Sequence, residues 1–218
     1  MTSHAKMKKR LKFVCAIICC YIVLVSATYT AQWKENIYSR IRICRQMEKE
    51  VSSDTAKKIV EEAEYFPVCE DKSGKESYSF EDVYGHGRQY GGNRKHEGID
   101  IMTSNNQAGY FAIRSVTDGV IEKKGWLELG GYRLGIRSAS GVYYYYAHLN
   151  SYAKGMKCGT YIKAGDIIGY MGNTGYGKEG TKGKFDVHLH FGMYVNKKGK
   201  EKSINPYFLL RYLQKQSA

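Results

Sequence analysis

The chain has 218 residues, and its formal net charge is +13, from 34 Lys and Arg against 21 Asp and Glu. This length allows one ordinary domain with appendages. The positive charge favours polyanionic partners, but no recognised nucleic-acid motif accompanies it, so nucleic acid is not predicted. An anionic membrane surface and anionic cell-wall polymers remain candidate partners. Tyrosine is abundant, with 20 residues, and proline is scarce, with 2, which favours β-structure with polar, recognition-capable faces.

The six cysteines do not predict a disulfide framework. Three of them lie within an apolar run near the N-terminus, which leaves an odd number elsewhere. A single bridge between Cys44 and Cys69 stays open as an alternative. Cys158 lies in a turn-like stretch without a basic partner pattern, so a structural role is predicted for it.

The N-terminal segment is first basic and then apolar. A basic tail at 1–12, expected in the cytoplasm, precedes an apolar run of 15 residues at 13–27, FVCAIICCYIVLVSA. A spanning helix needs about 17–25 residues, and flanking residues can extend the run to a transmembrane anchor at 13–30. The competing interpretation is a cleaved signal peptide, because small residues at 25–27 offer a cleavage site. The first interpretation predicts a single-pass protein of the cell membrane with the bulk of the protein outside the cytoplasm.

Residues 31–66 show a helical pattern. Apolar side chains recur there at three- and four-residue spacings, with charged residues between them. Ser52-Ser53-Asp54 can break the helix and cap a second segment, and Pro67 ends the pattern. The pattern predicts a solvated helical stalk or a short dimerising coiled coil, so the oligomeric state stays open. A polar linker without periodicity is predicted at 67–84.

The segment 85–205 is predicted to be a mostly β domain, an antiparallel sheet or sandwich. Short β-like runs such as GVYYYYAHL and FDVHLHFGMYV alternate with glycine-rich turns. No helical pattern longer than a turn or two interrupts it. A C-terminal helix is expected at 206–218, where Asn205 can cap and Pro206 can begin the helix.

Five metal-type side chains lie in three short clusters of this domain. Imidazole nitrogen and carboxylate oxygen are the usual ligands of a catalytic zinc, which takes three protein ligands and keeps one position open for water. Five candidates leave three residues for a metal and two for proton transfer, which is the outline of a metal-dependent hydrolase. The five are His96, Asp100, His148, His188 and His190.

The cluster His188-Leu189-His190 has the spacing of a strand. Side chains at i and i+2 point to the same face, roughly 6.5–7 Å apart, while Leu189 points to the opposite face and into the core. Two imidazoles on one face can reach one metal, or one metal and its bound water. The alternative is a pair of surface histidines on a half-buried strand.

The cluster from His96 to Asp100 spans four residues, like the two ligands of a helical His-Glu-x-x-His motif. Gly98 and its β-branched neighbours disfavour a helix, so a strand that emerges from a loop is predicted instead. Gly98 would let the backbone pass close to the metal. Glu97 is predicted to face outward and not to act as a general base.

His148 ends a run of tyrosines in YYYYAHL. A period of two predicts that it shares a face with Tyr144 and Tyr146. The alternative is a core or rim histidine held by a neighbouring hydroxyl.

Taken in order, these segments resemble one family. The order His-x-x-x-Asp, Tyr-Ala-His-Leu, Gly-Asn-Thr-Gly and His-Leu-His, over residues 90–194, is similar to the lysostaphin-type (LytM-domain) zinc metallopeptidases, which cut peptidoglycan peptides. The resemblance implies one zinc ion per chain, bound by His96, Asp100 and His190, with water in the fourth position.

The resemblance also implies roles for three further residues. His148 and His188 would act on the bound water and the tetrahedral intermediate, with His188 as the general base. Tyr90 matches a tyrosine that helps to stabilise the oxyanion in such enzymes.

The implied function is a membrane-anchored zinc endopeptidase that hydrolyses peptide bonds in peptidoglycan stem or cross-link peptides. The alternative is a non-catalytic, zinc-binding wall protein or scaffold in cell division or sporulation. The presence of both His148 and His188 favours the enzyme. Which bond is cut, and in which process, stays open.

Overall fold

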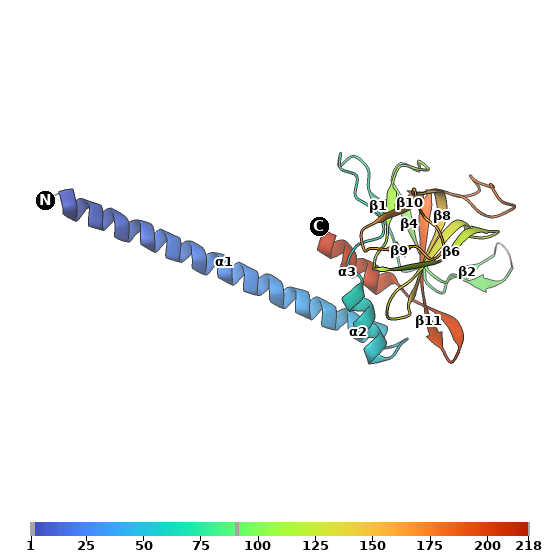
Figure 1. Ribbon diagram of the computed structural model, residues 1–218, viewed down its shortest axis with the longest axis horizontal. Coiled ribbons are helices and arrows are strands. Elements are labelled where there is room, and N and C mark those ends of the chain that lie inside the picture. Colours follow the sequence, from blue (N-terminus) through green and yellow to red (C-terminus); the bar gives the residue numbers. More distant parts are fainter. Residues whose placement is uncertain (1–2, 90–91, 218) are drawn as a thin grey trace. The chain divides into compact units, whose positions relative to one another are not determined.

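The computed structural model describes residues 3–89 and 92–217. It consists of two compact units, Met1–Arg42 and Ile43–Ala218. The first unit lies within the long helix α1 (Ser3–Met47), whose last residues belong to the second unit (Figure 1). Most of the large apolar side chains described in the first unit, such as Ile18 and Leu24, are exposed.

The predicted membrane anchor needs correction. Among the residues that the structure describes, no helix contains an apolar stretch of sufficient length to cross a membrane. The apolar run of 15 residues is shorter than the roughly 17–25 that a spanning helix needs, and it merges into a polar continuation of α1. This finding overturns the anchor at 13–30 and the single-pass membrane location inferred from it.

The second unit is built on one large antiparallel sheet. Its strands follow the order β1-β4-β11-β8-β7-β6-β9. Off this path, β12 pairs with β11, β10 pairs with β8, and β5 pairs with β10, while β2 and β3 form a separate hairpin. Every pairing among the described strands is antiparallel, which confirms the predicted mostly β fold. The strands are β1 (Tyr78–Ser79), β2 (Gly87–Arg88), β3 (Arg94–Lys95), β4 (Ile99–Thr103), β5 (Ala112–Arg114), β6 (Gly119–Leu127), β7 (Gly131–Arg137), β8 (Tyr143–Tyr152), β9 (Tyr161–Ile162), β10 (Ile167–Met171), β11 (His188–Lys197) and β12 (Lys200–Ile204).

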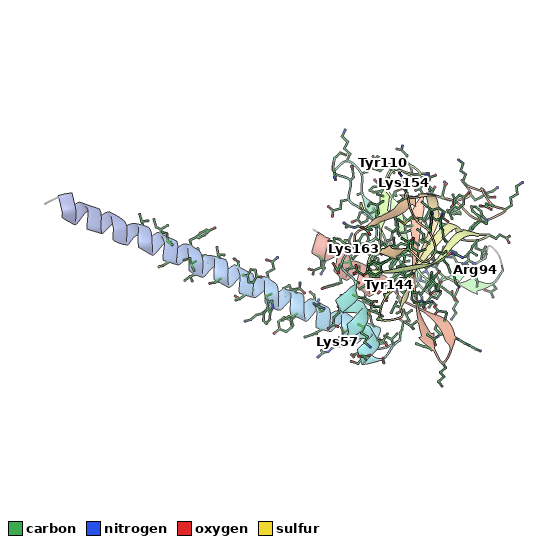
Figure 2. The ribbon with its side chains drawn as sticks, viewed as in Figure 1. Lys57, Arg94, Tyr110, Tyr144, Lys154 and Lys163 are labelled. Atoms are coloured by element: carbon green, nitrogen blue, oxygen red, sulfur yellow. The ribbon has the colours of Figure 1, made fainter. Side chains whose placement is uncertain are left out.

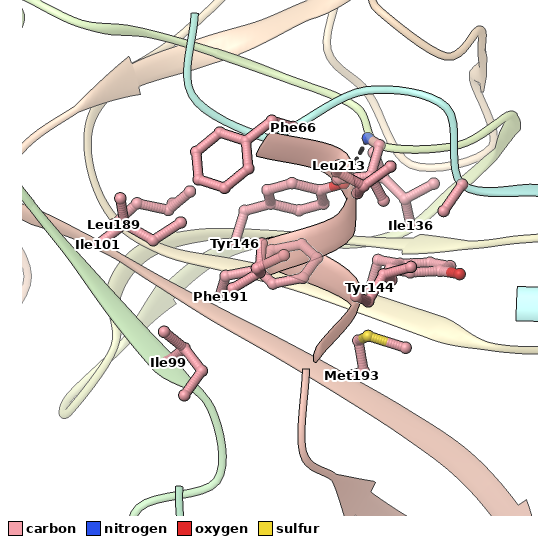
Figure 3. Close-up of a cluster of buried hydrophobic side chains, with 14 of the residues drawn as sticks. Phe66, Ile99, Ile101, Ile136, Tyr144, Tyr146, Leu189, Phe191, Met193 and Leu213 are labelled. Atoms are coloured by element: carbon pink, nitrogen blue, oxygen red, sulfur yellow. Dashed lines mark hydrogen bonds between the residues drawn. The ribbon is translucent and has the colours of Figure 1, made fainter. Parts of the chain in front are cut away.

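One face of the sheet carries the hydrophobic core. Tyr146 of β8 and Phe191 of β11 are fully buried and in contact, with ring centroids 5.3 Å apart. Phe66 and Leu213 join them from outside the sheet (Figure 3). Leu213 belongs to the C-terminal helix α3 (Tyr207–Ser217), and Asn205 caps this helix by accepting a hydrogen bond from the Tyr207 amide.

The helix α2 (Ser53–Glu62) is part of this core and not of a stalk. Ser52 caps it by accepting from the Thr55 amide, and Ile59 is fully buried. The Glu62 carboxylate accepts hydrogen bonds from the buried Tyr144 hydroxyl at 2.9 Å and from a serine hydroxyl. The apolar stripe that suggested a solvated stalk at 31–66 is therefore buried from residue 43 onward, because the sheet supplies the surface that it packs against.

No disulfide links the cysteines described in the second unit. Cys44 and Cys69 form no bridge with each other, so the alternative of a disulfide between them is wrong. Burial raises the pKa of the Cys69 thiol, which keeps it protonated and unreactive. Cys158 is exposed.

Candidate metal centre

The pairing of β4 with β11 brings two of the predicted ligands together. His190 lies directly opposite Asp100 in this antiparallel ladder, so both side chains point to the same face of the sheet. Leu189 and Phe191, the neighbours of His190, point to the opposite face and are fully buried. The predicted alternation along His188-Leu189-His190 is confirmed.

His96 joins them from the segment that leads into β4. Its backbone is held by two hydrogen bonds, from its amide to the His86 carbonyl and from the Gly85 amide to its own carbonyl. Its ring is buried, and its Nδ1 donates to the Val83 carbonyl at 3.1 Å. When Nδ1 carries the only ring proton, Nε2 presents a lone pair towards the site.

Three donor atoms converge on one point. His96 Nε2 lies 2.9 Å from His190 Nδ1 and 3.0 Å from Asp100 Oδ1, and these last two atoms are 3.0 Å apart. Acceptor atoms lie this close together only when a proton or a metal cation stands between them. Ligands about 2.0–2.1 Å from a tetrahedral zinc lie roughly 3.3–3.4 Å apart, so a shift of a few tenths of an ångström would admit the ion. The set His96, Asp100 and His190 thus fits a zinc ion.

Gly98 makes the convergence sterically feasible. A Cβ atom at this position would lie 2.5 Å from the Phe191 carbonyl oxygen and 2.7 Å from His190 Nε2. Any side chain would therefore push β11 and the His190 ring away from β4. The predicted close passage of the backbone at Gly98 agrees with this geometry.

His188 and His148 lie beside the three donors, and both rings are buried. Each ring is oriented by a backbone carbonyl, because His188 Nδ1 donates to Asp186 and His148 Nδ1 donates to Thr174, both at 2.7 Å. The lone pair of each neutral ring is thus at Nε2. The two ring centroids are 4.7 Å apart, and His188 Nε2 lies 3.8 Å from Asp100 Oδ1.

His148 reaches the site by a different route from the one predicted. Tyr144 and Tyr146 are fully buried on the core face, and simple alternation would place His148 there too. The residue instead has φ 62°, and the ladder with β7 slips by one residue between the pairs Tyr132–Leu149 and Leu134–Tyr146. This β-bulge turns the imidazole towards the metal centre, so the shared face with Tyr144 and Tyr146 is corrected.

The protonation states of the site suit metal binding. Burial lowers the pKa of His148 well below its ordinary value, and it also lowers the pKa of His188 and of His190, although Asp100 opposes this effect. Burial would raise the pKa of Asp100, but hydrogen bonds to His190 and His96 outweigh it and hold that pKa well below the usual range. Neutral imidazoles and an ionised carboxylate are the forms that ligate metals.

Two residues of the site were not foreseen. Arg88 Nη2 lies 2.5 Å from Asp100 Oδ2, so the second carboxylate oxygen is held away from the three converging donors. The Asn106 side chain accepts from the Val187 amide at 2.6 Å and donates to the Asp186 carboxylate at 3.0 Å. It thereby fixes the backbone that orients His188. Neither residue stands in a recognisable motif, and only the three-dimensional contacts reveal them.

Two other predicted positions have different outcomes. Tyr90 lies outside the described residues, so its predicted role at the oxyanion stays a prediction. Glu97 is exposed, and its carboxylate accepts from the Tyr194 hydroxyl at 3.3 Å, so the prediction that it faces outward is confirmed.

Comparison with known proteins adds independent evidence. The L-Ala–D-Glu endopeptidase of Bacillus subtilis (strain 168) is 45% identical over 134 residues, which cover 62% of this chain and 40% of the relative. Lysostaphin of Staphylococcus simulans is 34% identical over 103 residues, 46% of this chain and 18% of the relative. The chain thus matches less than half the length of either protein.

A solved structure and a family model agree with these relatives. A protein of Ruminococcus gnavus ATCC 29149, assigned as a glycyl-glycine endopeptidase lytM, superposes with a TM-score of 0.68 at 45% identity, over 78% of this chain and 70% of that one. The model of peptidase family M23 matches residues 94–206, which include the three converging donors and both neighbouring histidines. The chain therefore belongs to peptidase family M23.

Proposed function

We propose that this protein is a zinc endopeptidase that hydrolyses peptide bonds in the stem or cross-link peptides of peptidoglycan. The observation that carries the proposal is the convergence of three donor atoms about 3 Å apart beside two further buried imidazoles. The named activities of the Bacillus and Staphylococcus relatives support the same reaction. The Bacillus relative makes the bond next to a D-glutamyl residue a candidate for cleavage.

In this proposal His96, Asp100 and His190 would hold the zinc. A bound zinc lowers the pKa of its water to about 7 and polarises the scissile carbonyl. Asp100 supplies the negative charge of the ligand set, and the imidazoles are the neutral ligands. Because Arg88 holds one carboxylate oxygen, Asp100 would offer the other as a single donor.

His148 and His188 would carry out the proton transfers. Each is neutral, and each has its Nδ1 proton committed to a backbone carbonyl, so each can accept a proton at Nε2. The carbonyls also stabilise the imidazolium that forms, because each Nδ1–H then donates to its carbonyl more strongly. His188 is assigned as the general base and His148 as the residue that acts on the intermediate.

Aromatic side chains flank these groups and would bind an extended peptide. The Phe185 ring lies 4.6 Å from that of His148, and the Tyr145 ring lies 5.9 Å from that of His190. Flat rings on either side of a metal centre suit a backbone with small side chains, which stem peptides and cross-bridges both provide.

The test separates metal ligands from proton-transfer groups. Asp100→Ala and His190→Ala should lose bound zinc and, with it, activity. His148→Ala and His188→Ala should keep most of the zinc but lose about two to four orders of magnitude in activity. Zinc content by mass spectrometry and release of soluble wall fragments are measured on the same samples. His86→Ala is the matched control, because His86 is exposed and its side chain lies outside the donor set.

Two outcomes would contradict the proposal. Loss of zinc from His148→Ala or His188→Ala would show that the ligand assignment is wrong. A wild-type protein that binds zinc but cuts no wall, while all four variants still rescue a deletion strain, would favour the non-catalytic scaffold.

A further inference from the structure

The hairpin β2–β3 carries two arginines on the same face. Arg88 and Arg94 lie directly opposite each other in its ladder, so their side chains project to the same side. Both are half-buried, whereas Gly87 and Lys95, which form the other pair of the ladder, are exposed. The arginine face of the hairpin is therefore turned towards the body of the domain.

Each of these two guanidinium groups lies beside a different side chain at the metal centre. Arg88 Nη2 contacts Asp100 Oδ2 at 2.5 Å. Arg94 Nη2 lies 3.5 Å from the Tyr176 hydroxyl, and the Tyr176 ring packs against His148 at 6.1 Å between centroids. One arginine thus lies beside a predicted ligand, and the other lies beside a residue that contacts a predicted proton-transfer group. Figure 2 labels Arg94 at the hairpin.

This arrangement concentrates positive charge at the site. Like charges directly opposite each other in a ladder destabilise the pairing. The Asp100 carboxylate compensates the positive charge of Arg88 through Oδ2. Its other oxygen, Oδ1, faces two imidazoles and would share the negative charge of the carboxylate with a divalent ion. Two further carboxylates lie nearby: Glu97 accepts a hydrogen bond from the Tyr194 hydroxyl, and Asp186 accepts one from the Asn106 amide. With a metal bound, the centre would carry net positive charge and favour an anionic group in the substrate.

We propose that Arg88 and Arg94 form a subsite that binds a carboxylate of the substrate next to the scissile bond. A guanidinium matches a carboxylate with two parallel hydrogen bonds, and Arg88 has further N–H groups besides the one directed at Asp100. The inference rests on the proposed function and narrows its substrate class. A γ-linked D-glutamyl residue keeps its α-carboxylate free beside the peptide bond, whereas a glycine cross-bridge has no such group. The subsite therefore selects stem peptides over glycine bridges.

The test uses two peptides that differ in one group. Both are stem tripeptides with a γ-linked D-glutamyl residue, one with the free α-carboxylate and the other with a carboxamide there. The wild-type zinc protein should cut the carboxylate peptide with a kcat/KM about 10- to 100-fold higher, as expected for hydrogen bonds to a charged group. A pentaglycine peptide should be cut no faster than the carboxamide.

Arg94→Gln is the informative variant, because the described hydrogen bond of the Arg94 side chain goes to Tyr176 and not to a predicted zinc ligand. It should lower kcat/KM for the carboxylate peptide by about 10- to 100-fold and change the carboxamide value less than about threefold, so the preference collapses. Arg94→Lys should restore part of the preference, since charge returns without the forked geometry. Lys154→Gln removes a positive charge from an exposed position apart from Arg94 in Figure 2 and should leave the preference unchanged.

The possible failures are distinguishable. Equal cleavage of both peptides by the wild type, faster cleavage of pentaglycine, or an equal loss on both peptides in Arg94→Gln would overturn the subsite and leave the endopeptidase standing. A wild type that binds zinc and cuts none of the three peptides or purified walls would overturn both proposals. The Arg88→Gln variant provides a measurement that does not depend on activity. Its zinc affinity should fall, because Asp100 loses the guanidinium that holds its second oxygen, Oδ2.

Discussion

Replacement of Gly98 by alanine tests how closely β4 must approach β11 for the metal centre to form. The added Cβ would lie 2.5 Å from the Phe191 carbonyl oxygen, 2.7 Å from His190 Nε2 and 2.8 Å from His190 Cε1. Ordinary contacts begin near 3.4 Å, so the backbone of β11 must retreat by 3.4 − 2.5, roughly 0.9 Å. Such overpacking costs about 1–3 kcal/mol. Alanine also lowers the conformational entropy of the unfolded chain, which stabilises the folded state by about 0.4–1 kcal/mol.

Gly98→Ala should therefore lose about 1–2 kcal/mol in the free energy of unfolding. The effect of this substitution on zinc affinity should be larger than its effect on stability, because metal sites tolerate ligand displacements of only about 0.2 Å. Zinc affinity should fall at least about tenfold. Urea titration of the metal-free protein measures the first quantity, and competition with a chelator measures the second.

Gly87→Ala is the matched control for this substitution. Gly87 lies outside the left-handed region, and a Cβ there would meet no atom within 4 Å. Its stability and zinc affinity should stay close to those of the wild type. Wild-type zinc affinity in Gly98→Ala would refute the idea that contact between the two strands sets the ligand geometry.

Three further predictions follow from the site and the core. Burial lowers the pKa of His148 and His188, so the unfolded chain takes up protons first as the pH falls. The stability that these rings contribute is complete above about pH 6.5 and is lost progressively as the pH falls below it, as urea titrations of the metal-free protein should show. Tyr144→Phe removes one of two hydrogen bonds to Glu62 and should cost about 1–2 kcal/mol in unfolding free energy without changing zinc content; an unchanged midpoint would contradict that role. Asn106→Ala frees the backbone before His188 and should lower kcat about tenfold with zinc content intact; unaltered kcat would show that the amide is dispensable.

The parts of the site that the sequence predicts are those that depend on local spacing. The shared face of His188 and His190 follows from the two-residue period of a strand, and the structure confirms it. Gly98 signals a close backbone approach because a side chain is missing there. The mostly antiparallel sheet follows from short alternating runs and glycine-rich turns.

The parts that sequence patterns miss depend on contacts between distant segments. Arg88 and Asn106 each act through one partner that only the folded chain brings near, and no spacing rule identifies them. The apolar stripe of α2 was recognised, but periodicity cannot tell whether a stripe faces solvent, another copy or the same domain. The position of His148 depends on a left-handed backbone conformation, which the letters YYYYAHL do not reveal.

The bulge at His148 makes one strand serve two incompatible environments. The rings of Tyr144 and Tyr146 on β8 pack into the hydrophobic core. Two residues after Tyr146, the same strand places the His148 imidazole at the polar metal centre. An unbroken pleat would bury that imidazole among hydrocarbon. Deleting Ala147 would remove the bulge and leave a regular ladder in which His148 alternates with Tyr146 and Leu149, so the later side chains would keep their faces. A single extra residue thus lets β8 turn His148 towards the metal centre and still return Leu149 to the core.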